Sequence, residues 1–89
     1  MRRVTQEPRF DRDIKRLKRR NKDIDKLLAI VAILRHAGRL PTQFRPHKLT
    51  GEYEGQWECH VELDWLLVYD ITDREVMLAR TGSHEDLFG

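Results

Sequence analysis

The stretch HVELDW, residues 60–65, combines a histidine and an aspartate with alternating apolar residues. On a strand, His60, Glu62 and Asp64 would share the polar face, because successive side chains point to opposite sides. Histidine serves as either acid or base near neutral pH, since its unperturbed pKa is about 6.5. The stretch therefore indicates either the solvent-exposed face of a half-buried sheet or part of an acid–base site.

Spacing limits what this stretch can do alone. His60 and Asp64 are four residues apart, which is about 13 Å on a straight strand, too far to share a proton. The chain must therefore turn at Asp64, and further histidines must arrive from elsewhere. Aspartate is also simply a good turn residue, so a structural role for Asp64 remains open.

Two more histidines and an aromatic residue could complete a site. His47 precedes a short predicted strand, and His84 lies in SHEDLFG with Phe88 four residues later. Phe88 either folds back into the core or stacks on a nucleic acid base, and stacking contributes about 1–3 kcal/mol per base. Lys48 and Arg80 are candidate phosphate contacts, and plain surface charge is the alternative for both.

A metal site is not favoured, and we expect no cofactor. The sequence has no close pair of histidine or cysteine ligands at metal-like spacing, and Cys59 is expected to face away from His60. As the lone cysteine it cannot form an internal disulfide, and we expect a buried thiol. His36 is most simply a favourable cation at a helix end.

Periodicity predicts two helices and then a sheet. A helix over about 8–20 begins at Pro8, and a second, with Asn21 as its N-cap, ends before Gly38. Short strands are expected over 2–6 and 47–49, and longer ones over 56–63, 65–71 and 75–82. A turn at residues 63–64 and a final helical turn capped by Ser83 complete the order. The expected fold is one α+β domain over residues 1–89, β-α-α-β-β-β, with a helical hairpin on a mainly antiparallel sheet.

Side-chain faces can be assigned on the long hairpin strand. Trp57, Cys59, Val61 and Leu63 should face the helices, and the residues between them should face solvent.

Charge is distributed unevenly. Residues 1–48 contain 15 Lys and Arg against 5 Asp and Glu, a net +10, whereas residues 49–89 contain 2 against 10, a net −8. The basic part attracts polyanions, of which nucleic acid is the commonest, or is only a solvated helix surface. No apolar run reaches the roughly 20 residues of a membrane span, and the first residues do not resemble a secretion signal, so we expect a cytoplasmic protein.

These elements and motifs together resemble the RelE/ParE superfamily of bacterial toxins, and most closely its YafQ-like branch. The resemblance extends over essentially the whole chain and is carried by RRNKDIDKL, HKLTGEYEG, HVELDWLLVY and RTGSHEDLFG. Matching positions imply a RelE-like fold and an active site at His47, His60, Asp64, His84 and Phe88, with Trp65 as a neighbouring substrate contact.

The resemblance also implies an activity and partners. It implies a ribosome-dependent, metal-independent mRNA endoribonuclease, in which a ribose 2′-OH attacks the adjacent phosphate and the 5′-OH leaves. A cognate antitoxin would hold the toxin inactive, in a heterotetramer of two toxins and two antitoxins that binds operator DNA through the antitoxin.

Two other functions remain open within the superfamily. One is a non-cleaving protein that acts only with its antitoxin as an operon repressor, and the other is a ParE-like inhibitor of gyrase. Neither needs the set of histidines, which therefore discriminates between the three.

Overall fold

The computed structural model describes residues 1–89, which form three α-helices, five strands and two short 3-10 helices. The elements in chain order are β1 (Arg3–Gln6), α1 (Pro8–Arg19), α2 (Ile24–Ala37), η1 (Thr42–Phe44), β2 (His47–Lys48), η2 (Gly51–Tyr53), β3 (Trp57–Glu62), β4 (Trp65–Ile71), β5 (Glu75–Gly82) and α3 (His84–Phe88). The predicted α+β fold is confirmed; the structure has five strands, one more than the order β-α-α-β-β-β contains, because the short strand predicted over 47–49 is present as β2. No helix has the length and apolar character that crossing a membrane requires.

One mixed sheet holds all five strands, in the order β1-β5-β4-β3-β2. β1 runs parallel to β5, and every other pair is antiparallel. β2 is so short that it pairs only with Trp57 and Glu58 of β3. The outer edge of β3 is therefore free of a partner strand from Cys59 to Glu62.

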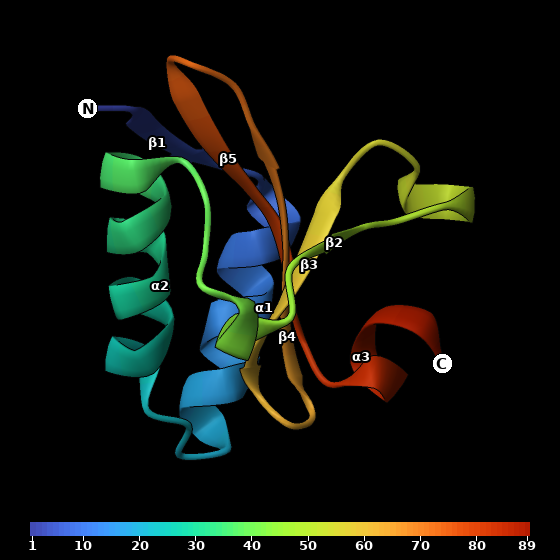
Figure 1. Cartoon of the computed structure of the whole chain (residues 1–89). Coiled ribbons are helices and arrows are strands. Elements are labelled where there is room, and N and C mark those ends of the chain that lie inside the picture. Colours follow the sequence, from blue (N-terminus) through green and yellow to red (C-terminus); the bar gives the residue numbers. More distant parts are fainter.

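The two faces of the sheet carry different layers (Figure 1). α1 and α2 cover one face and bury the larger apolar cluster, which includes Leu17, Leu34 and Leu67. α3 lies on the other face, where Leu87 packs with Leu66 in a smaller cluster. The second face is less covered, which leaves room for polar side chains on β3.

The link between α1 and α2 differs from the prediction. Asp23, not Asn21, is the N-cap of α2, and its carboxylate accepts a hydrogen bond from the backbone N–H of Asp25 at 3.1 Å. Asn21 instead has a φ of 61°. Both residue types cap helices, but asparagine also tolerates the left-handed region better than most, which suits it to the link.

A bulge reverses the predicted faces at the end of β3. The register with β4 shifts between His60 and Glu62, so an extra residue interrupts the alternation. Glu62 consequently reaches the helix side, where its carboxylate binds the ammonium groups of Lys22 and Lys26 at 2.9 and 2.8 Å. Leu63, expected on the apolar face, is 80% exposed in the turn.

Candidate functional site

The turn after β3 brings Asp64 to the start of α3. Asp64 Oδ1 accepts two hydrogen bonds from His84, one from its backbone N–H at 2.9 Å and one from Nδ1 at 2.8 Å. The predicted bend at Asp64 and the arrival of a distant histidine are both present.

The hydrogen bonds from His84 determine which atoms of this pair carry protons. They lower the pKa of Asp64 below its ordinary value, the backbone N–H contributing most and the imidazole next. The carboxylate is therefore ionised at neutral pH and can only accept, so Nδ1 of His84 carries a proton. The other ring nitrogen, Nε2, remains available for chemistry.

His60 is oriented in the same way by a different acceptor. Its Nδ1 lies 3.2 Å from the backbone oxygen of Leu63, and a carbonyl oxygen only accepts, so Nδ1 is again the donor. The rings of His60 and His84 are 6.1 Å apart, centroid to centroid, and inclined at 51°. Two imidazoles with free Nε2 atoms therefore stand side by side.

Phe88 lies beside this pair rather than in the core. Its side chain is 49% exposed, and its ring is 6.4 Å from that of His84. On its other side it meets Tyr53 of η2 edge to face, with centroids 5.6 Å apart. Sequence reasoning missed Tyr53, because a tyrosine in a glycine-flanked turn carries no signal of its own.

Asp86 and Arg20 attach the short helix α3 to the body of the protein. Ser83 and Asp86 form a capping box at the start of α3. The Asp86 carboxylate also accepts two hydrogen bonds from the Arg20 guanidinium, at 2.7 and 3.1 Å. A helix of five residues is not stable by itself, so these contacts hold His84 in place.

This attachment predicts acid sensitivity. The Arg20 guanidinium holds the pKa of Asp86 well below its ordinary value, so the stabilisation is present above about pH 4 and is lost as the pH falls further. The free energy of unfolding of the wild type, measured by urea denaturation, should therefore fall more steeply from about pH 5 to pH 3 than that of Asp86→Asn. The exposed Asp73→Asn serves as the control and should follow the wild type; equal slopes for wild type and Asp86→Asn would contradict the assignment.

His47 lies on the same sheet but apart from the pair. Its Nδ1 is 3.1 Å from the backbone oxygen of Arg45, and its Nε2 is 3.3 Å from the buried carboxylate of Glu58. An imidazolium can donate to both acceptors at once. His47 forms no hydrogen bond or ring contact with His60 or His84, so it is a neighbour of the pair rather than a third member of it.

Arg80 is held inside the protein. Its guanidinium donates to both carboxylate oxygens of Asp13 at 2.7 and 3.1 Å and to the Tyr53 hydroxyl at 3.3 Å. Only 8% of the residue is exposed. The predicted phosphate contact at Arg80 is therefore an ion pair in this conformation, and its link to the site passes through Tyr53.

The two other predicted substrate contacts are placed differently from each other. Trp65 is fully buried on the helix side, where its indole N–H donates to the Thr81 hydroxyl at 2.9 Å. It has no surface to offer a substrate in this conformation. Lys48 is exposed, and its ammonium lies 5.8 Å from the centre of the Trp57 ring.

The residues do not form a metal-binding cluster. No group of three or more His, Cys, Asp and Glu side chains is placed to hold an ion. Cys59 is buried as predicted, and burial raises the pKa of its thiol to about 12.

Comparison with known proteins assigns the chain and its fold to a family. A model of the family described as bacterial toxin of type II toxin–antitoxin system, YafQ, matches residues 2–89. The chain belongs to the YafQ family. The mRNA interferase toxin YafQ of Escherichia coli K12 is 37% identical over 81 residues, which are 90% of this chain and 88% of that protein.

Solved structures of YafQ toxins have the same fold. The crystal structure of YafQ from E. coli BL21(DE3) superposes with a TM-score of 0.92 at 33% identity and covers 100% of both chains. YafQ in the crystal structure of the E. coli DinJ–YafQ toxin–antitoxin complex gives a TM-score of 0.90 at 35% identity over 99% of this chain and 98% of that one. The predicted RelE-like architecture is thereby confirmed.

Proposed function

We propose that this YafQ-family toxin is an mRNA interferase, an endoribonuclease that cuts mRNA on the ribosome. The observation that carries the proposal is the pair of neighbouring imidazoles, His60 and His84, each with Nδ1 engaged and Nε2 free. Cleavage of RNA by its own 2′-OH needs one group to take a proton and another to give one, and two positioned histidines satisfy both needs.

In the proposed reaction His60 is the base and His84 the acid. Nε2 of His60 takes the proton of the 2′-OH, whose oxygen forms a bond to the adjacent phosphorus. The bond from phosphorus to the 5′ oxygen breaks, and that oxygen receives the proton of His84 Nε2. The products are a 2′,3′-cyclic phosphate and a 5′-OH end.

The environments of the two rings support these roles. Protonated His84 forms an ion pair with Asp64, whose carboxylate is 2.8 Å away, which suits an acid that starts charged. Nδ1 of His60 donates to the carbonyl of Leu63, so in the neutral ring Nε2 carries the lone pair that a base requires. Asp64 is in this scheme a positioning residue that orients His84.

Nearby groups would bind the RNA. Half-exposed Phe88 offers a face on which a base can stack beside His84. His47 on β2 lies on the same face of the sheet as His60 and would contact the substrate there, whereas Lys48 extends over Trp57 on the helix face. The many exposed Arg and Lys side chains of α1 would contact ribosomal RNA. The basic half of the chain would thus bind the ribosome, and the acidic half would hold the catalytic residues.

A cognate antitoxin is the proposed inhibitor of this activity. E. coli YafQ, which has the same fold, crystallised in complex with DinJ. We infer that this chain likewise pairs with a small antitoxin, in a heterotetramer of two copies of each that binds operator DNA through the antitoxin. Because the substrate is mRNA on ribosomes, the site of action is the cytoplasm.

Mapping of mRNA 5′ ends after induction of the toxin tests this function. We expect new 5′-OH ends within translated regions, and none when translation initiation is blocked. The absence of new ends under translating conditions would overturn the proposed function. Cleavage of naked RNA at the same positions would instead remove the ribosome dependence.

A further inference from the structure

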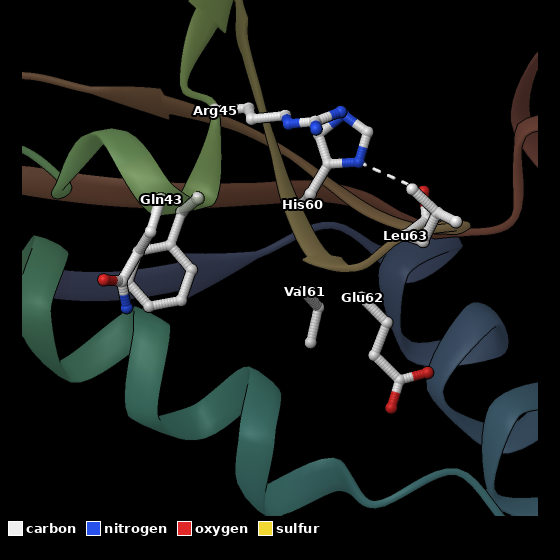
Figure 2. A pocket seen from close by; sticks show the side chains of 7 residues that line it. Gln43, Arg45, His60, Val61, Glu62 and Leu63 are labelled. Carbon is white, nitrogen blue, oxygen red and sulfur yellow. Dashed lines mark hydrogen bonds between the residues drawn. The ribbon is translucent and has the colours of Figure 1, made fainter.

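An open hollow lies next to His60, whose side chain forms part of its lining. Its volume is about 330 Å³, and it is lined by η1, the residues that follow it and the end of β3 (Figure 2). It occurs where the outer edge of β3 has lost its partner strand, because β2 pairs only with Trp57 and Glu58. The hollow therefore continues the proposed active surface past His60.

Arg45 supplies the free positive charge of this hollow. Its side chain lines the hollow together with His60, as Figure 2 shows. The guanidinium has no hydrogen-bond or ion-pair partner within the protein, whereas that of Arg80 is occupied by Asp13. Glu62, the one carboxylate of the lining, is already bound to Lys22 and Lys26. Arg45 is thus the one charged side chain of the lining that lacks a partner within the protein.

The backbone of Arg45 is held in an unusual conformation. Its φ and ψ are 51° and 50°, in the left-handed region that residues with a side chain seldom adopt. Its backbone oxygen accepts the hydrogen bond from Nδ1 of His47. One residue therefore connects His47 through its backbone with the His60 hollow through its side chain, and strain of this kind is concentrated at functional sites.

We propose that this hollow is a subsite for the RNA backbone, in which Arg45 binds the phosphate oxygens adjoining the nucleotide that reacts at His60. The subsite deepens the proposed function and rests on it. A guanidinium suits this role, because its planar set of donors matches two phosphate oxygens and its charge is permanent. Gln43, which also lines the hollow, would contact the same nucleotide.

The substitution Arg45→Gly removes the side chain and keeps the backbone conformation of the loop. Glycine adopts the left-handed conformation without penalty, so the loop and the bond from His47 to the backbone oxygen are retained. Arg45→Lys keeps the charge but loses the planar donors. Arg39→Ala is the matched control, because Arg39 is an exposed arginine of the same loop.

Cleavage of mRNA on programmed ribosomes is the first measurement. Arg45→Gly should lower kcat/KM by about 10- to 100-fold, reduce the slope of log kcat/KM against log salt by about 0.7, and leave the urea midpoint no lower than that of the wild type. Arg45→Lys should recover part of the rate, and Arg39→Ala should match the wild type. Wild-type rates and an unchanged salt slope for Arg45→Gly would overturn the proposal.

A binding measurement separates this inference from the proposed function. The wild-type protein is titrated with a 2′-O-methylated hexauridylate, which cannot react through its 2′ oxygen, and amide and guanidinium NMR signals are followed. We expect shifts at Arg45, Gln43 and Leu63 that Arg45→Gly abolishes. If the wild type failed to cut mRNA but showed these shifts, the proposed function would fail and the subsite would stand; no shift at Arg45 would overturn the subsite.

Discussion

His84→Ala and His60→Ala are each expected to lower the rate of mRNA cleavage by at least about 100-fold, because each removes one of the two proton-transfer groups. Folding should survive both changes, since neither histidine belongs to the apolar core. The measurements are single-turnover cleavage on programmed ribosomes and growth after induction. The wild type should arrest growth, and both variants should be harmless.

The control for these variants is His36→Ala. His36 is exposed near the end of α2, and it is neither hydrogen-bonded nor close to the site. The His36→Ala variant should cleave mRNA and arrest growth like the wild type. Full toxicity of both His60→Ala and His84→Ala would rule out the proposed catalytic pair.

Asp13→Ala is expected to destabilise the protein by about 3–5 kcal/mol, because it leaves the Arg80 guanidinium buried without its partner. Asp13 is 1% exposed, and its carboxylate also accepts the backbone N–H of Thr81 at 3.1 Å. This N–H lies on β5 beyond Leu78, the last residue that β1 pairs. Asp13 therefore neutralises Arg80 and also accepts a backbone hydrogen bond that a neighbouring strand would otherwise accept.

The effect of Asp13→Ala is measured as the free energy of unfolding from urea denaturation at neutral pH. Asp73→Asn, a change at an exposed carboxylate in the turn before β5, should change it by no more than about 0.5 kcal/mol. Replacing both partners, Asp13→Leu with Arg80→Met, should recover part of the lost stability, since no buried charge then lacks a partner. If Asp13→Ala were as stable as the wild type, the ion pair would have no structural role.

The order of elements and the meeting of Asp64 with His84 were predictable from the sequence. Regular apolar spacing identifies the helices and long strands, and a four-residue separation on a strand requires a turn at Asp64 for any shared chemistry. Ser83 was recognisable as a cap because it precedes acidic residues. Such local signals predict the structure correctly because the tertiary contacts favour the same local conformations.

Other features depend on contacts between distant residues and were not predictable. Glu62 belongs to the solvent face by alternation, but the bulge turns it to Lys22 and Lys26. The sequence suggests that Arg80 is a surface charge, but in the structure Asp13, 67 residues away, binds its guanidinium. Asp13 did carry a signal, since it lies three residues after Phe10 and four before Leu17 on the buried stripe of α1.

In the proposed reaction the 2′-OH of the substrate is the nucleophile, and two histidines carry out the proton transfers. The most direct measurement uses an mRNA bound to ribosomes with a single 2′-O-methyl group on the nucleotide 5′ of the cleaved bond. We expect the wild-type protein to cut the unmodified mRNA and to leave the methylated mRNA intact at that bond. Cleavage of the methylated mRNA at the normal rate would show that another nucleophile, such as water, attacks the phosphate, and would contradict the claim.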